Sequence, residues 1–212
     1  MKNKSEQKIS PRLARNYANL ATDDQRHIYR EWAETYDKEL IEDFGYVAPR
    51  ESVDALAVRI PDHTAPVLDM GCGTGLVGHL LDQAGYEYID GIDLSPEMLE
   101  KANFLGIYRN LWEGDLTDVI NVPPIYQAVI CVGVFSHQPN QPFLIPNLLD
   151  CLRPGGLVIA TVNGKGWRDI GWVELLEKSR QQHNFSIDSI EDIGYLEKQG
   201  IDGKLLFMRQ GH

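Results

Sequence analysis

The chain has 212 residues, a length that suits one domain of ordinary size. Its hydrophobic fraction of 43% is enough for a buried core, and its charged fraction of 24% is too low for a disordered polyelectrolyte. Thirty-one acidic residues against 20 Lys and Arg give a net charge of −11. Neither nucleic acid nor an anionic membrane gains from an acidic partner, so we expect neither as a partner of this protein.

The beginning of the sequence and the cysteines predict a cytoplasmic protein. The first ten residues, MKNKSEQKIS, lack the apolar core of a signal peptide, and no apolar run has transmembrane length. Cys72, Cys131 and Cys151 have neither the number nor the spacing of a disulfide framework or a CxxC metal site. Each lies in or beside an apolar, glycine-rich or helical stretch, which is typical of a reduced, buried thiol.

The first 60 residues have helical patterns, and the pattern changes after Pro66. Thr22 can cap a helix with apolar residues at every fourth position, and a second amphipathic segment follows Pro49. After Pro66, short apolar runs alternate with helical patterns. The runs are 67–70, 88–93, 128–134 and 157–162, and the helical patterns are 76–84, 95–105 and 142–152. Such alternation predicts βαβ units, with a mostly parallel sheet and helices on both faces.

The last part of the chain predicts one long helix over residues 167–184 and then a hairpin. Two runs, around 190–197 and 204–209, are separated by Gly200, Asp202 and Gly203, which favours an antiparallel hairpin. We therefore predict an α/β domain over residues 61–212, with residues 1–60 as a helical cap or lid of the same domain. Ligands of such sheets bind beyond the carboxyl ends of the strands.

The strongest local signal is VLDMGCGTG at residues 67–75, where a strand ends and a glycine-rich loop opens a helix. Glycines permit the tight turn and let a ligand approach the backbone closely. The loop could bind a dinucleotide or S-adenosylmethionine, since Gly73, Gly75 and Gly78 also satisfy the dinucleotide pattern G-x-G-x-x-G. Asp93 lies where an acid that binds the ribose of either ligand belongs. Asp69 separates the two interpretations, because a carboxylate favours the cationic methionyl moiety of S-adenosylmethionine and disfavours a pyrophosphate.

Two further segments have the residue types of a nucleoside site. In IDGIDLSPEML (89–99), Asp93 could accept ribose hydroxyl protons or simply cap the turn, and Met98 could pack on adenine or on the core. In EGDLTDV (113–119), Asp115 could accept the adenine amino proton and Leu116 could stack on the base. Gly-Asp is also a common turn, so the second segment alone decides nothing.

Taken in order, these motifs resemble those of the class I S-adenosylmethionine-dependent methyltransferases. VLDMGCGTG is similar to the first motif of that family, IDLSPEMLEKA to its second-strand motif, EGDL to its adenine-contact motif, and LRPGG (152–156) to the turn before its fifth strand. The resemblance implies a Rossmann-like sheet of seven strands, with a reversed seventh strand in the C-terminal hairpin. It also implies S-adenosylmethionine as the cofactor and S-adenosylhomocysteine as its product.

The resemblance assigns roles to individual residues. The glycines of the loop would line the methionyl part, Asp93 the ribose, and Asp115 with Leu116 the adenine, while Tyr36 would close over the cofactor from the N-terminal helix. The full set of expected cofactor contacts is Tyr36, Asp69, Gly71, Cys72, Gly73, Thr74, Gly75, Asp93, Leu94, Met98, Asp115 and Leu116.

Methyl transfer is an in-line displacement at the methyl carbon of a sulfonium, so the protein contributes mainly alignment and exclusion of water. Where the acceptor must lose a proton, His137, after the fourth strand, is the best-placed base; a histidine that hydrogen-bonds a loop is the alternative. Side chains that could line the acceptor pocket are Tyr17, Trp32, Phe135, Asn163, Lys165 and Trp167. They favour a small or medium organic acceptor.

Two other functions are compatible with the sequence. A nicotinamide-dependent oxidoreductase would use Gly73, Gly75 and Gly78, although Asp69 and the terminal hairpin count against it. A catalytically silent regulator would bind S-adenosylmethionine and methylate nothing. We predict a methyltransferase without a metal that acts on a small molecule, and the sequence leaves the acceptor, the methylated atom and the oligomeric state open.

Overall fold

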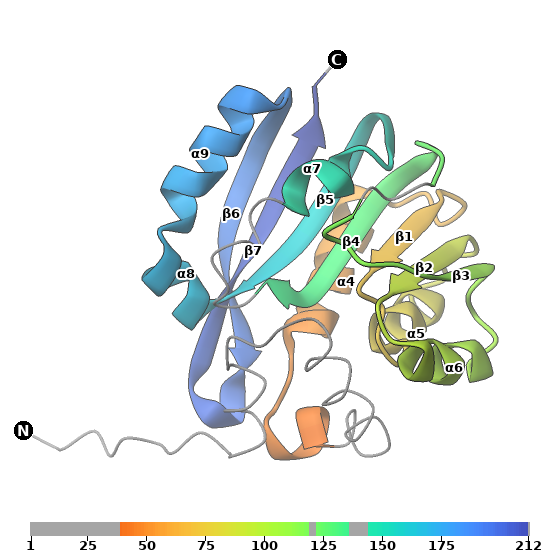
Figure 1. Cartoon of the computed structure of the whole chain (residues 1–212). Helices are drawn as coiled ribbons and strands as arrows, with labels where there is room; N and C mark the ends of the chain where they lie inside the picture. Colours follow the sequence, from red (N-terminus) through yellow and green to blue (C-terminus); the bar gives the residue numbers. More distant parts are fainter. Residues whose placement is uncertain (1–38, 119–121, 136–143, 212) are drawn as a thin grey trace, which may run out of the picture.

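The sheet at the centre of the protein has the predicted topology. The computed structural model describes residues 39–118, 122–135 and 144–211 (Figure 1). Within them, seven strands form one sheet in the order β3-β2-β1-β4-β5-β7-β6. They are β1 (Val67–Met70), β2 (Ile89–Asp93), β3 (Asn110–Glu113), β4 (Tyr126–Phe135), β5 (Leu152–Asn163), β6 (Phe185–Leu196) and β7 (Ile201–Gln210). Strands β1 to β5 pair in parallel, and β7 runs antiparallel to both β5 and β6, so the prediction is confirmed.

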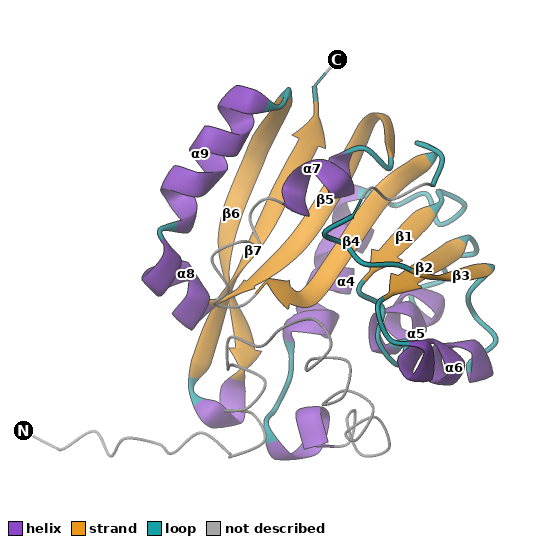
Figure 2. Ribbon diagram, viewed as in Figure 1, coloured by secondary structure: helices purple, strands orange, loops and turns teal. Residues whose placement is uncertain are grey.

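Helices cover both faces of the sheet, as the alternating pattern predicted (Figure 2). One face packs against α4 (Ala48–Arg59) and α5 (Leu76–Gln83), and the other against α7 (Ile145–Leu149) and α9 (Trp172–Gln182). The remaining elements are α6 (Pro96–Phe104) beside α5, α8 (Gly164–Ile170) after β5, the π-helical turn η1 (Glu39–Asp43) and the 3-10 turn η3 (Glu197–Gln199). None of the helices in the described ranges is both long and apolar enough to cross a bilayer.

The strands alternate between the two cores, and this alternation places the polar residues of the site. In β1, Val67 lies in the core under α4 and α5, whereas Leu68 and Met70 lie in the core under α7 and α9. Successive side chains of a strand point to opposite faces. Asp69 therefore points to the face that α5 covers.

The predicted start of α6 is confirmed, whereas the single helix predicted over residues 167–184 is wrong. Ser95 caps α6 by accepting a hydrogen bond from the backbone N–H of Met98, and Pro96 occupies the first turn. In place of one long helix the structure has α8 and α9, separated by Gly171 with φ +73°. A residue in this left-handed conformation ends a helix, and the chain then turns so that Trp172 enters the core.

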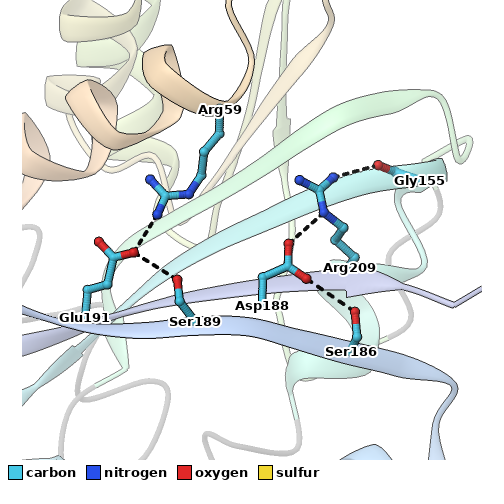
Figure 3. Close-up of polar contacts among 7 residues, drawn as sticks. All are labelled: Arg59, Gly155, Ser186, Asp188, Ser189, Glu191 and Arg209. Carbon is cyan, nitrogen blue, oxygen red and sulfur yellow. Dashed lines mark hydrogen bonds and ion pairs between the residues drawn. The ribbon is translucent and has the colours of Figure 1, made fainter.

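Two arginines attach the C-terminal hairpin to the rest of the domain (Figure 3). Arg59 at the end of α4 donates to Glu191 of β6 at 2.5 Å. Arg209 of β7 donates to Asp188 of β6 at 2.7 Å and to the carbonyl oxygen of Gly155 in β5 at 3.0 Å. The hairpin is thereby fixed to a helix and to the neighbouring strand as well as by the sheet's own hydrogen bonds.

Candidate functional site

The glycine-rich turn between β1 and α5 forms the floor of the site. Gly71, Gly73 and Gly75 have φ angles of +76°, +55° and +95°, which side-chain-bearing residues rarely adopt. A Cβ atom on Gly71 would lie 2.4 Å from Val134, so β4 approaches the turn closely. A Cβ atom on Gly73 would meet no atom of the described residues within 4 Å. The turn therefore depends on glycine and leaves open space over Gly73.

Asp93, at the carboxyl end of β2, holds this turn in place. The backbone N–H of Gly73 donates to its Oδ2 at 2.8 Å, and the N–H of Ser95 donates to its Oδ1 at 2.9 Å. Burial raises the pKa of Asp93, and these two N–H groups oppose that rise. The Asp93 side chain is half-buried, so its carboxylate both shapes the turn and lies near the open side.

Asp69 lies fully buried near the turn and is only partly satisfied. Its Oδ2 accepts a hydrogen bond from the Tyr108 hydroxyl at 2.7 Å, while its Oδ1 is buried and has no hydrogen-bond partner among the described residues. Burial raises the pKa of Asp69 to about 7, and the bond from Tyr108 opposes the rise. Buried carboxylate oxygens without a partner are rare, so this oxygen marks a place where a donor or a cation would be stabilised.

The carboxyl end of β4 is distorted beside the turn. Four steps along β4, from Cys131 to Phe135, match only two along β5, which indicates a bulge. Within it, Gly133 has φ +83° and donates its N–H to the Thr161 hydroxyl at 3.0 Å. A Cβ atom on Gly133 would lie 2.6 Å from the Tyr46 hydroxyl. Sequence reasoning missed Tyr46, because its approach to Gly133 is a tertiary contact with no local motif.

Asp115 and Leu116 follow β3 at the same edge of the sheet. Oδ1 of Asp115 accepts hydrogen bonds from the N–H and the hydroxyl of Thr117, at 2.9 and 2.7 Å. The carbonyl oxygen of Leu116 accepts from the side chain of Asn147 at 2.8 Å. Both predicted residues are half-buried, and a side chain on Gly71 would come within 4 Å of Leu116. The structure thus places Leu116 next to the turn.

The other predicted cofactor contacts differ in how exposed they are. Cys72 and Thr74 are buried within the turn, and burial raises the pKa of the Cys72 thiol well above its usual range. Met98 is buried at the start of α6, and Leu94 is half-buried beside Asp93. The side chains of Cys72 and Thr74 are therefore enclosed by the protein, which leaves their backbone atoms as the groups that could contact a ligand.

Four of the residues predicted to line the acceptor pocket lie where β4 and β5 end: Phe135, Asn163, Lys165 and Trp167. Phe135 is fully buried and packs edge-on against Trp172, with 5.3 Å between the ring centroids. Trp167 stacks on the ring of Trp172, with 6.4 Å between the centroids. Asn163 is buried and caps α8 by accepting from the N–H of Lys165 at 2.9 Å, whereas the Lys165 side chain is exposed. Three aromatic rings and one exposed amine therefore adjoin this edge.

Four predicted residues, Tyr17, Trp32, Tyr36 and His137, lie outside the described residues. Among the residues that are described, the His, Cys, Asp and Glu side chains form no group of three or more able to hold a metal ion.

A family model described as a methyltransferase domain matches residues 11–200 of this chain. The chain belongs to this methyltransferase family. Methyltransferase-like protein 27 of Homo sapiens is 34% identical over 175 residues, which cover 81% of this chain and 67% of that protein. The likeness extends well beyond the glycine turn.

Two further methyltransferases place the family assignment in context. The ubiquinone biosynthesis O-methyltransferase of Xylella fastidiosa is 31% identical over 119 residues, so the matched segment covers 52% of this chain and 47% of that relative. The magnesium protoporphyrin IX methyltransferase of Synechocystis PCC 6803, solved with bound S-adenosylhomocysteine, has the same fold, with a TM-score of 0.60 at 18% identity. That likeness covers 94% of this chain and 93% of the solved one. The protein is thus an S-adenosylmethionine-dependent methyltransferase.

The turn of this methyltransferase fits such a cofactor. The space over Gly73 is open, and the unpartnered oxygen of Asp69 is suited to a cationic group rather than to a diphosphate. The dinucleotide pattern has a different explanation, because a Cβ atom on Gly78 would lie 2.2 Å from the Tyr108 hydroxyl. Gly78 therefore makes room for a tyrosine of the same chain.

Proposed function

We propose that this methyltransferase binds its cofactor over the turn of residues 71–75 and methylates a small organic molecule held at the carboxyl ends of β4 and β5. The observation that supports the proposal best is the meeting of two features at one edge. The open turn and the bulged end of β4 adjoin where Gly71 approaches Val134, and Gly133 in that bulge is exposed to solvent. A donor and an acceptor bound at this edge would be neighbours.

The cofactor side of the proposal rests on three carboxylates. When bound, S-adenosylmethionine supplies a methyl group attached to a sulfonium sulfur. Loss of the methyl group to the acceptor turns this sulfonium into a neutral thioether, which is the leaving group. Asp93 would accept the ribose hydroxyl protons, and Asp69 would stabilise the positive charge of the methionyl part. Asp115 still has its second carboxylate oxygen for the adenine amino group, with Leu116 beside it. The closing role of Tyr36 and the contacts of Leu94 and Met98 stay predictions.

The acceptor side would be formed by the half-buried Tyr46 at Gly133 and by the half-buried Trp167, which stacks on the fully buried Trp172. These groups can enclose a small organic molecule and exclude water from it. The net charge of −11 argues against a nucleic-acid acceptor. Two of the methyltransferases compared above are named for small organic molecules, a quinone and a porphyrin. His137 as the base, and Tyr17 and Trp32 as further acceptor contacts, stay predictions.

We also propose a cytoplasmic location. Cys72, Cys131 and Cys151 are free and buried, and burial raises the pKa of the Cys151 thiol to about 12. Unpaired thiols of this kind suit a reducing compartment. Fluorescence of a tagged full-length chain in cells would test the location.

Two measurements test the proposed function. Thermal-shift titration with S-adenosylmethionine, S-adenosylhomocysteine and NAD(H) should give stabilisation by the first two only. A radiolabelled-methyl screen against a fractionated metabolite extract should then label a small molecule, and Asp93→Ala should abolish the labelling. Stabilisation by NAD(H) alone would contradict the methyltransferase function. Binding without any labelled product would favour the silent regulator instead.

A further inference from the structure

We propose that Tyr108 is a positioning residue, which holds Asp69 in the orientation and charge state needed to bind the cationic part of the cofactor. The inference extends the proposed function, since it rests on the role proposed there for Asp69. Tyr108 lies between α6 and β3, outside the motifs that the sequence analysis singled out.

The fold lets Tyr108 reach Asp69 across an intervening strand. The two residues are 39 positions apart, and the Tyr108 hydroxyl donates to Oδ2 of Asp69 at 2.7 Å. Between them lies β2, in which Gly91 pairs with Asp69 of β1. A Cβ atom on Gly91 would lie 3.0 Å from the Tyr108 ring. The phenol can therefore pass over β2 only because the residue there has no side chain.

Two more glycines complete a slot for the same ring. A Cβ atom on Gly78 would lie 2.2 Å from the Tyr108 hydroxyl oxygen, and one on Gly75 would lie 3.2 Å from the ring. Gly78 lies within α5, where glycine is less favourable than alanine. The turn, α5 and β2 each contribute a glycine to this slot. Such a slot fixes the hydroxyl against Asp69, which a merely space-filling ring would not require.

The described groups around Asp69 carry no positive charge, so the protonation state of Asp69 depends on the Tyr108 hydroxyl. The described groups that interact with Asp69 are Asp93, Cys72, Cys131, Tyr108 and the backbone N–H of Gly78, and none of them carries a positive charge. Burial raises the pKa of both thiols and of the phenol, so these three stay neutral, while Asp93 adds negative charge. The pKa of Asp69 is about 7, and the bond from Tyr108 favours the ionised form.

Because no described group supplies a counter-charge for Asp69, we assign that role to the ligand, and Tyr108 keeps the carboxylate ready for it. Without the hydroxyl, both carboxylate oxygens would lack a donor from a side chain, and protonation of Asp69 would compete with binding at neutral pH. A protonated Asp69 attracts a cation far less strongly. Loss of the hydroxyl should weaken cofactor binding most where Asp69 is close to its pKa.

Isothermal titration of the full chain with S-adenosylmethionine, from about pH 6 to pH 8.5, tests the inference. For the unmodified protein, affinity should rise as the pH passes about 7. Tyr108→Phe should weaken binding about tenfold at neutral pH, as one lost hydrogen bond to a charged group predicts, and should displace the rise toward higher pH. Asp69→Asn should remove the rise around pH 7.

Tyr126→Phe is a matched control from the same sheet. It removes a phenol that donates to the other buried carboxylate, Asp90, at 2.8 Å. This variant should lose thermal stability and keep the binding profile of the unmodified protein. Should Tyr108→Phe fail to fold, Gly78→Ala is the second variant, because its Cβ atom displaces the Tyr108 hydroxyl while the tyrosine itself is retained. The same change in the pH profile of binding is expected.

The outcomes separate this inference from the function on which it rests. A Tyr108 or Gly78 variant that melts earlier but binds with unchanged affinity and pH profile would show that Tyr108 only packs, and the inference would be overturned. Absence of binding by the unmodified protein at every pH would instead overturn the proposed function.

Discussion

Two buried carboxylates on neighbouring strands differ in how completely the protein satisfies them. Asp90 of β2 accepts hydrogen bonds from Arg109 at 2.5 and 3.1 Å, from Asn110 at 2.9 Å and from Tyr126 at 2.8 Å. Burial alone would raise its pKa, and these donors hold the pKa below its usual value. Asp69 of β1 is equally buried, yet one of its oxygens has no partner in the described part of the chain, and burial raises its pKa to about 7.

The difference follows the direction of the strands. Asp90 is the second residue of β2, near the amino end of the parallel strands, where no ligand is expected. Asp69 lies next to the last residue of β1, near the carboxyl end and beside the glycine turn. At the amino end the chain satisfies its own buried charge, whereas at the carboxyl end it leaves an acceptor for something else to satisfy. Partial satisfaction is thus a better indicator of the site than burial.

The largest effect that this comparison predicts is on folding. Asp90→Ala should lower the free energy of unfolding by about 3 kcal/mol, because it leaves Tyr126 without its acceptor and Arg109 without its carboxylate. The folded fraction should bind S-adenosylmethionine as the unmodified protein does. Urea unfolding measures the stability, and calorimetric titration measures the affinity. A large loss of affinity at unchanged stability would contradict the assignment of stability to the amino end of the strands and of binding to the carboxyl end.

The pH dependence of stability should distinguish Asp69 from Asp90. Folding raises the pKa of Asp69 from 3.8 to about 7, so the folded state keeps a proton that the unfolded state loses. The contribution of Asp69 to stability is therefore fully present below about pH 4 and is lost, by up to a few kcal/mol, as the pH rises through 7. Asp69→Asn should flatten this decline in urea unfolding of the ligand-free protein. If the free energy of unfolding of Asp69→Asn fell with pH as steeply as that of the unmodified protein, another group would be responsible for the decline.

The smallest effect concerns two glycines at opposite ends of the sheet. Gly73, in the turn, and Gly155, near the amino end of β5, have φ angles of +55° and +77°, and a Cβ atom would meet nothing within 4 Å at either position. Alanine at each should cost about 1 kcal/mol through backbone strain. Only Gly73→Ala should weaken binding of S-adenosylmethionine, by filling the open space. Equal affinities of the two variants in calorimetric titration would place the cofactor elsewhere.

Much of the fold could be predicted from the sequence, because its signals are local. The strand over 67–70 ends at a glycine loop, and Ser95 with Pro96 marks the start of α6, so both boundaries can be read from adjacent residues. The break between α8 and α9 was also present in the sequence as Gly171, but a single glycine within a helical pattern does not by itself reveal a left-handed conformation.

The contacts that give the site its properties could not be predicted, because they join distant residues. Tyr108 meets Asp69 across 39 positions, and the Tyr46 hydroxyl approaches Gly133 from a different part of the chain. Phe135 was expected to line a pocket, and its place against Trp172 depends on a bulge that no sequence pattern indicates. Single residues become chemically distinctive only when the sheet has brought these segments together.

The insertion of β7 between β5 and β6 has a consequence for biosynthesis. On the ribosome, β5 and β6 emerge before residues 201–210, which separate them in the finished sheet. Until those residues are translated, the nascent polypeptide carries an open, apolar strand edge able to pair with other chains. Chaperone capture of ribosome-bound intermediates should therefore be greatest just before residues 201–210 leave the exit tunnel.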